Sequence, residues 1–216
     1  MKRWSCLLMI LALALVLAGC GAREPEEAVP NPVATITLTD GSQMRIELRP
    51  DIAPNTVNNF IKLANDGFYD GQQIFRVVSN VLIQMGDPNN DGTGDPGYYI
   101  KGEFDANGFK NGLSHMRGTV SMARKSDYDT GGSQFFIMEG SYPEYDGNYA
   151  AFGTLADAAS LETLDQIGSR PVDGSYVPLD RIRIQRIRVE TFEAEYPDPE
   201  TLKKDEIDNR KDGKKK

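Results

Sequence analysis

Two polar side chains stand among hydrophobic residues in the stretch 75–87, which reads Phe-Arg-Val-Val-Ser-Asn-Val-Leu-Ile-Gln-Met-Gly-Asp. They are Arg76 and Gln84, in two short apolar runs separated by a Ser-Asn break typical of a turn or bulge. Because a buried unpaired charge is costly, Arg76 either extends to solvent or is held by partners in a concave wall. Leu82 and Gln84 share one strand face, so the stretch could supply a pocket wall. This stretch alone leaves an alternative open. In it, Arg76 lies on the surface and Gln84 is hydrogen-bonded to backbone.

The glycine-rich residues 87–98 imitate two ligand-binding motifs. Asp87, Asn89 and Asp91 have the spacing of the first half of an EF-hand loop, but Tyr98 stands where the bidentate Glu is required. The glycines of 92–97 match a dinucleotide fingerprint, but no helix pattern follows them. We therefore predict no metal site and no cofactor, and we interpret the glycines as a long turn close to other backbone.

His115 is the only histidine among the 216 residues. A histidine-based metal cluster needs several histidines, so a single histidine makes such a site improbable. We therefore interpret His115 as a structural residue.

The first twenty residues resemble a lipoprotein signal peptide. A basic start is followed by an apolar run at 7–17, too short for a comfortable membrane span, and then by Leu-Ala-Gly-Cys at 17–20. The resemblance implies removal of residues 1–19, a lipid on Cys20, and anchoring in a bacterial cell envelope outside the cytoplasm. Cys6 would leave with the signal, so no disulfide could form in the mature chain.

The remaining chain is acidic and is expected to form one domain. The full sequence has 24 basic and 32 acidic residues and a net charge of -8, and loss of Lys2 and Arg3 would leave 22 and 32, or -10. An acidic body argues against broad nucleic-acid binding. Residues 20–32 are expected to be a flexible tether, 33–195 the folded domain, and 196–216 a charged tail that stays solvated.

Hydrophobic periodicity predicts the first elements of the domain. Residues 34–38 and 44–48 alternate around an Asp-Gly turn and predict a hairpin. Residues 53–64 have apolar positions at helical spacing, with Asn55 or Thr56 as a possible cap and Gly67 as a possible stop. Residues 181–189 alternate strictly and predict a late strand.

Seven short motifs follow in order along the chain. They are Phe-Arg-Val-Val, Gln-x-Gly-Asp, Gly-Thr-Gly, Val-Ser-Met-Ala, Gly-Ser-Gln-Phe-Phe-Ile, Asp-Gly-x-Tyr and Phe-Gly, between residues 75 and 153. With these motifs the chain resembles the cyclophilin family of peptidyl-prolyl cis-trans isomerases over residues 33–190. The resemblance implies a mostly β fold, a closed antiparallel barrel of about eight strands capped by two helices, the second at 158–167. Many short strands with glycine turns agree with such a barrel.

The resemblance also assigns roles to individual residues. It places the catalytic group at Arg76, Gln84 and Phe136, with Phe136 as the floor under the proline ring. The substrate-binding residues that it implies are Val81, Leu82, Thr93, Ala123, Arg124, Gln134, Tyr145 and Tyr149. The partners that it implies are proline-containing polypeptides, here exported proteins during folding, bound by a monomer whose only link to a membrane is its lipid.

Several positions depart from the family pattern. Val81 stands where Phe is usual, Glu144 near the usual Trp, Tyr145 for a Leu and Tyr149 for a His. A smaller Val81 reduces the apolar wall and should weaken binding by about 1–2 kcal/mol. We therefore expect an active isomerase that binds cyclosporin-like ligands more weakly than typical members. A non-catalytic proline-peptide binding module on the same fold is the alternative.

Overall fold

The computed structural model describes residues 29–212 of the chain. The predicted signal peptide, most of the tether and the lipidation residue Cys20 lie outside the described residues, as do residues 213–216. Among the residues that are described, no helix has both the length and the apolar character needed to cross a membrane.

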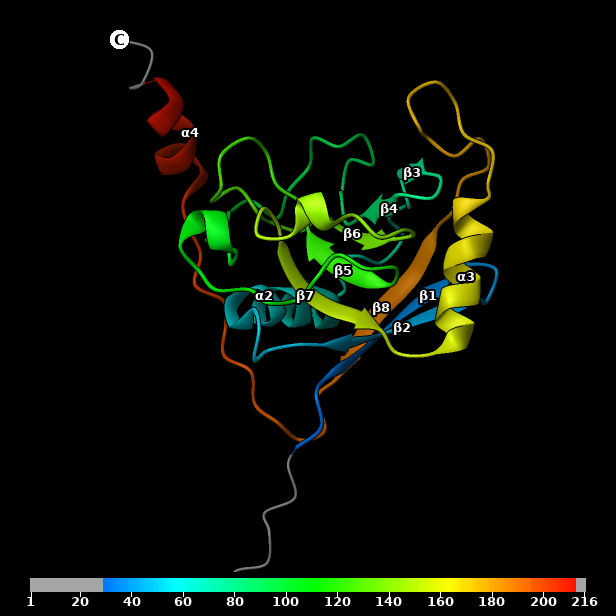
Figure 1. Cartoon of the computed structure of the whole chain (residues 1–216), viewed down its shortest axis with the longest axis horizontal. Coiled ribbons are helices and arrows are strands. Elements are labelled where there is room, and N and C mark those ends of the chain that lie inside the picture. The colour runs from blue at the N-terminus through cyan, green and yellow to red at the C-terminus, as the bar shows by residue number, and fades with distance from the viewer. Residues whose placement is uncertain (1–28, 213–216) are drawn as a thin grey trace, which may run out of the picture. The chain divides into compact units, whose positions relative to one another are not determined.

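Eight antiparallel strands form one curled sheet (Figure 1). They are β1 (Val33–Leu38), β2 (Gln43–Leu48), β3 (Arg76–Val78), β4 (Leu82–Met85), β5 (Thr119–Met122), β6 (Phe135–Met138), β7 (Ala150–Leu155) and β8 (Ile184–Glu190). Their spatial order is β3-β4-β6-β5-β7-β2-β1-β8. The hairpin of β1 and β2 turns at Asp40-Gly41 as predicted, and β8 is the predicted late strand.

Strand alternation gives the sheet two differently used faces. Phe135 on β6 and Ile83 on β4 are fully buried in the main core, which also holds the aromatic rings of Phe60 and Phe152. Their immediate neighbours in sequence point the other way, because successive strand residues lie on opposite faces. The opposite face of β3, β4 and β6 is therefore free to carry the candidate site.

Two helices pack against the sheet, as the sequence predicts. The helix α2 (Pro54–Asn65) contacts β8, and α3 (Ala158–Gly168) contacts β2. Gly67 follows α2 with a φ of +78°, in the left-handed region that glycine adopts without strain. Asp157 caps α3, because its carboxylate accepts the Ser160 N–H at 2.8 Å.

The cap of α2 differs from the prediction. Neither Asn55 nor Thr56 caps the helix with its own side chain; the carboxylate of Glu103 does so instead. It accepts the backbone N–H of Asn55 at 3.0 Å and that of Thr56 at 2.7 Å. A buried carboxylate from a remote loop satisfies the helix start and complements its dipole. Local sequence could not have indicated a partner that is distant along the chain.

The sheet curls, but a closed barrel is not established. β3 and β8 are its two edges, and no ladder joins them among the described residues. Backbone hydrogen bonds join the segment that precedes β3 to the start of β8 and the residues just before it. Ile184 N–H donates to Gln72 O at 2.8 Å, and Ile74 N–H donates to Ile182 O at 3.0 Å. The predicted eight antiparallel strands are confirmed. The sequence also suggested a closed barrel, but no strand ladder between β3 and β8 closes the sheet among the described residues.

The described part of the C-terminal tail is ordered against the domain, which differs from the expectation of a solvated segment. Leu202 pairs with Tyr99 as an isolated β-bridge, and the helix α4 (Lys204–Asp212) follows it. Ile207 of α4 is 1% exposed. This third helix lies beside the glycine-rich loops, remote from α3 (Figure 1).

Candidate active site

Four side chains from adjacent strands lie in one register row on the outer face of the sheet. Arg76 of β3 is opposite Gln84 of β4, Gln84 is opposite Phe136 of β6, and Phe136 is opposite Ser121 of β5. Directly opposed residues in antiparallel strands have their side chains on the same face and in contact range. The row therefore brings a guanidinium, an amide and an aromatic ring together.

Hydrogen bonds connect this row to the glycine-rich loop. Arg76 Nη1 donates to Gln84 Oε1 at 3.1 Å, and Gln84 Nε2 donates to Gln134 Oε1 at 3.0 Å. Gln134 Nε2 then donates to the carbonyl oxygens of Gly92 and Gly94, at 3.1 and 2.9 Å. Each amide both accepts and donates, so the chain of bonds fixes how each amide is oriented. It holds the half-buried guanidinium of Arg76 in the same row as Phe136.

An apolar cluster surrounds Phe136 on this face. Its buried members are Leu82, Phe136 and Met138, and its partly buried members are Val78, Val81, Ala123, Tyr142, Tyr145 and Tyr149. The rings of Tyr145 and Tyr149 meet Phe136 edge-on, with centroids 6.0 and 5.5 Å away. Edge-to-face contacts of this kind hold a ring in place. Burial raises the pKa of Tyr145, and the negative charge of Glu144 also contributes.

His115 supports the row from behind and has the structural placement that we predicted. Its ring stacks on Phe136 with a centroid separation of 6.1 Å, and Nε2 lies 3.0 Å from Ser121 Oγ. Nδ1 lies 2.9 Å from Asp146 Oδ1. Burial lowers the pKa of His115, against the opposing effect of Asp146. The neutral imidazole is thus the favoured form, and it is 1% exposed.

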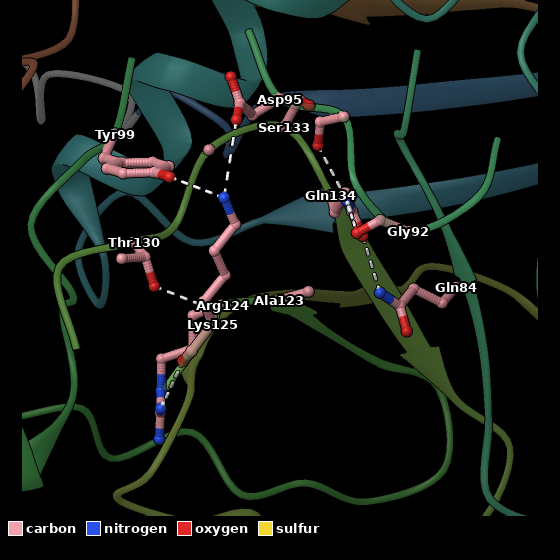
Figure 2. A pocket seen from close by; sticks show the side chains of 12 residues that line it. Gln84, Gly92, Asp95, Tyr99, Ala123, Arg124, Lys125, Thr130, Ser133 and Gln134 are labelled. Carbon is pink, nitrogen blue, oxygen red and sulfur yellow. Dashed lines mark hydrogen bonds and ion pairs between the residues drawn. The ribbon is translucent and has the colours of Figure 1, made fainter. Parts of the chain in front are cut away.

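A pocket of about 130 Å³ continues from the row toward the loops (Figure 2). Three residues line the pocket and also lie in the row or next to it: Gln84, Ala123 and Gln134. The other lining residues are Gly92, Gly94, Asp95, Tyr99, Arg124, Lys125, Thr130, Gly132 and Ser133. We call it the polar pocket because its mixed lining includes the charged groups of Asp95, Arg124 and Lys125. The cluster around Phe136 is apolar, so the site has two chemically different halves.

Two predicted substrate-binding side chains do not join the row. Arg124 lies over the rings of Phe104, Tyr128 and Tyr149, at 5.2, 4.9 and 4.8 Å from their centroids, and it donates to Asn148 O. It points away from Lys125 in Figure 2. Thr93 is exposed, and its hydroxyl donates to Asp91 Oδ1 at 2.6 Å. Both residues hold local structure. Arg124 is among the residues that line the pocket, whereas Thr93 is not.

The structure adds residues that sequence reasoning missed. Tyr142 joins the apolar cluster, and its spacing to Tyr145 and Tyr149 was a usable signal. Tyr176 comes from the loop between α3 and β8, and its ring centroid lies 5.9 Å from Arg76 Cζ. Nothing local to Tyr176 indicated this contact, because it depends on how a remote loop folds back.

Asp87 has a role in the loop that the EF-hand comparison did not suggest. Its buried carboxylate accepts the backbone N–H groups of Asn89, Asp91 and Gly92. The carboxylate therefore stabilises the backbone of its own loop. Within residues 29–212, no group of three or more His, Cys, Asp or Glu side chains is arranged to hold a metal ion.

The family model for cyclophilin type peptidyl-prolyl cis-trans isomerase/CLD matches residues 33–189. The chain belongs to the cyclophilin family. Peptidyl-prolyl cis-trans isomerase B of Bacillus subtilis (strain 168) is 47% identical over 118 residues, or 55% of this chain and 79% of the relative. A peptidyl-prolyl cis-trans isomerase of Helicobacter pylori (strain ATCC 700392 / 26695) is 41% identical over 142 residues, covering 66% and 83%.

Solved structures of other cyclophilins share the fold. The crystal structure of a cyclophilin type peptidyl-prolyl cis-trans isomerase from Cryptosporidium parvum has a TM-score of 0.67 and 32% identity, and the match covers 73% of this chain and 96% of that one. The same protein in the presence of the dipeptide Ala-Pro gives a TM-score of 0.65. With this family membership, the chain is a peptidyl-prolyl cis-trans isomerase.

Proposed function

We propose that this cyclophilin isomerises X-Pro bonds of exported proteins, with Arg76, Gln84 and Phe136 as its catalytic residues. The single observation that carries the assignment is the register row, in which Arg76 and Phe136 flank Gln84 on adjacent strands. A guanidinium beside an apolar ring suits a proline, since the ring of the substrate needs an apolar floor and its imide needs a donor.

Arg76 is the electrostatic catalyst in this proposal. Rotation about the prolyl bond must overcome a barrier of about 18–20 kcal/mol that arises from amide resonance. The twisted imide exposes a nitrogen lone pair that the planar ground state lacks, and an Arg donor directed at it stabilises the transition state alone. Gln84 holds the guanidinium through the 3.1 Å bond, and the charge of Arg persists at any physiological pH.

The remaining cluster residues form the proline pocket. Leu82, Val81, Tyr145 and Tyr149 line its apolar wall around Phe136, and Ala123 with Gln134 borders the polar half. A relative solved in the presence of the dipeptide Ala-Pro supports a proline-containing ligand. The narrow wall at Val81 is the basis for expecting weaker binding of cyclosporin-like ligands.

The cellular role rests on the N-terminal sequence. Residues 1–19 as a lipoprotein signal and Cys20 as the lipidated residue would tether the domain to a membrane outside the cytoplasm. There it would meet exported chains before they fold, when uncatalysed prolyl isomerisation takes tens of seconds or longer. A full-length Cys20→Ala protein should leave the membrane fraction, and its retention there would exclude the lipid anchor.

The catalytic proposal is tested with an alanyl-prolyl model peptide. The full-length protein should accelerate isomerisation, and Arg76→Ala should remove most of the acceleration while the peptide still binds. Glu144 is exposed where the family usually has Trp, and this favours one alternative, a proline-peptide binding module. Peptide binding by the unmutated protein without acceleration would establish that alternative.

A further inference from the structure

The C-terminal segment is attached to the back of the polar pocket at several points. Leu202 and Tyr99 exchange backbone hydrogen bonds of 2.7 and 3.0 Å. Glu200 and Asn55 are joined by a second pair, in which Glu200 N–H donates to Asn55 Oδ1 at 2.7 Å and Asn55 Nδ2 donates to Glu200 O at 3.0 Å. Buried Ile207 anchors the helix that follows. Tyr99 is itself a pocket residue, so the segment and the pocket share a wall.

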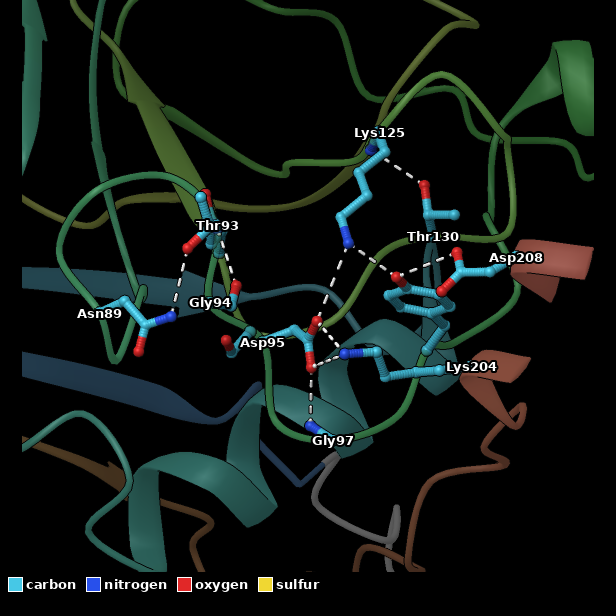
Figure 3. A network of polar contacts seen from close by, with 12 residues as sticks. Asn89, Thr93, Gly94, Asp95, Gly97, Lys125, Thr130, Lys204 and Asp208 are labelled. Carbon is cyan, nitrogen blue, oxygen red and sulfur yellow. Dashed lines mark hydrogen bonds and ion pairs between the residues drawn. The ribbon is translucent and has the colours of Figure 1, made fainter. Parts of the chain in front are cut away.

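Lys204 of α4 reaches into this wall and binds Asp95 (Figure 3). Its ammonium lies 2.6 and 2.9 Å from the two carboxylate oxygens of Asp95, and 5.7 Å from the centroid of the Tyr99 ring. Asp208, one turn later, lies 3.4 Å from Tyr99 Oη. Asp95 has only 12% of its side chain exposed, so Lys204 is the main compensation for its charge.

Lys125 extends toward the same carboxylate from inside the pocket. Its ammonium donates to Tyr99 Oη at 2.7 Å, whereas its nearest Asp95 oxygen is 3.9 Å away. Figure 3 shows the two lysines converging on Asp95 from different elements. An ammonium has three donors, and the bond to Tyr99 uses one of them. Lys125 is thus the cation that a bound side chain would meet, with 47% of its side chain exposed.

The charges that line the pocket leave a positive excess. The charged lining residues are Asp95, Arg124 and Lys125, and Arg124 is held among aromatic rings. Burial opposes the charge of Asp95, but the hydrogen bond from Lys204, that from Gly97 N–H and the two lysine charges keep the pKa of Asp95 below its usual value. Asp95 therefore stays ionised and paired with Lys204, and it compensates Lys125 only weakly.

We propose that Lys204 acts through Asp95 as a specificity-determining residue, which leaves Lys125 to select client segments that carry an anionic side chain near the proline. The inference rests on the isomerase activity of the adjoining row, with which the pocket shares Gln84 and Gln134. Without Lys204, Asp95 would turn to Lys125 and neutralise it. Lys204 is a positioning residue, since it touches neither the row nor the pocket interior.

The test measures kcat/KM for a series of peptides in which one glutamate is moved along an alanine segment on either side of a proline. Each peptide has a matched glutamine version, and rates are compared at low ionic strength. The full-length protein should prefer glutamate over glutamine by about two- to fivefold at one position, the range expected for partly exposed charge pairs. Lys204→Met should abolish this preference and leave the glutamine rate unchanged. Lys125→Met should also abolish the preference.

Two further variants separate specificity from general effects. Lys204→Arg retains the charge and should retain the preference. Lys203→Met changes the net charge equally, but Lys203 is 77% exposed and pairs with Glu206, so it should have no effect. An unmutated protein without a glutamate preference would refute the proposal. So would equal losses in Lys203→Met and Lys204→Met, or a Lys204→Met protein that is slower on every peptide. If the unmutated protein did not accelerate isomerisation of the glutamine peptides, the isomerase function itself would be refuted.

Discussion

Arg76 and Gln84 face each other across the β3–β4 pair, and the guanidinium donates to the amide oxygen at 3.1 Å. Gln84 in turn donates to Gln134, so the position of the charge depends on a polar chain that ends in the backbone of the glycine-rich loop. The donor is therefore preorganised before a peptide binds, which is what electrostatic catalysis requires.

Removal of the Arg76 guanidinium should cost activity rather than stability. We expect Arg76→Ala to lower kcat/KM by on the order of 100-fold, or about 2.7 kcal/mol of transition-state stabilisation, mostly through kcat. Arg76→Lys should recover only part, because an ammonium lacks the planar set of donors. The measurement is the rate of prolyl isomerisation in a model peptide, with thermal unfolding as the check on folding.

Arg45→Ala provides a matched control for that experiment. Arg45 lies on β2 with half of its side chain exposed, and it pairs with Asp157 at 3.4 Å. It should leave the isomerisation rate unchanged. If Arg76→Ala retained a third or more of the activity, Arg76 would not be the electrostatic catalyst.

Gly86 and Gly41 offer a comparison in which the backbone strain is the same and the surroundings differ. Both have a φ of +89°. A Cβ at Gly41 would meet nothing within 4 Å, whereas a Cβ at Gly86 would collide with the carbonyl oxygen of Ser133. Gly41→Ala should therefore cost only about 1 kcal/mol, the strain of an L-residue in this region, and lower the Tm by about 2–4 °C.

Gly86→Ala should be clearly more destabilising, by roughly 3 kcal/mol or more, because backbone must move as well. The displaced Ser133 adjoins Gln134, so we also expect a lower isomerisation rate in Gly86→Ala alone. Calorimetric or optical melting of the two variants supplies the comparison. Equal Tm shifts would mean that the close approach of Gly86 to Ser133 does not contribute to stability.

His115 should make the stability of the domain depend on pH near neutrality. Its pKa is lowered in the folded state by burial, from an ordinary value near 6.5, so the unfolded chain binds the proton more readily. The stability that comes from neutral His115 is full above pH 6.5 and falls as the pH drops toward the lower folded-state pKa. Asp146 opposes this shift and limits its size.

Denaturant unfolding between pH 8 and pH 5 measures the effect. The unmutated protein should lose stability over the lower part of that range, with a slope of at most about 1.4 kcal/mol per pH unit for one proton. His115→Gln should be less stable throughout but lack this slope. Because the chain has one histidine, no other imidazole can account for the difference. A slope that persists in His115→Gln would assign the titration to another group.

The residues of the candidate row were easier to predict from the sequence than the long-range contacts around them. Alternation within short strands places Phe135 in the core and Phe136 on the opposite face, and the same rule separates Ile83 from Gln84. The motif order then places Arg76 beside them. These features are local, and local patterns are what a sequence displays directly.

The contacts that were not predicted are long-range. Glu103 caps α2 from 47 residues beyond Thr56, and Tyr176 returns from a late loop to Arg76. The C-terminal tail has too few apolar residues to produce a periodic pattern, so charge dominates its sequence. Its docking depends on Leu202 finding the backbone of Tyr99 and on burial of Ile207, neither of which the tail's composition reveals.

Val81 should limit how tightly the apolar half of the site binds a proline. It lies partly buried in the turn between β3 and β4, packed against the cluster that contains Phe136. Replacement by a larger ring would add apolar contact, and we expect Val81→Phe to strengthen peptide binding by about 1 kcal/mol, or roughly fivefold in KM. Val81→Ala should weaken peptide binding, because it removes more of the apolar surface beside Phe136. Cyclosporin-like ligands, measured by inhibition of the isomerase, should follow the same order across the three proteins. A Val81→Phe protein with unchanged Tm and weaker binding would show that the turn already fills the space beside the proline ring.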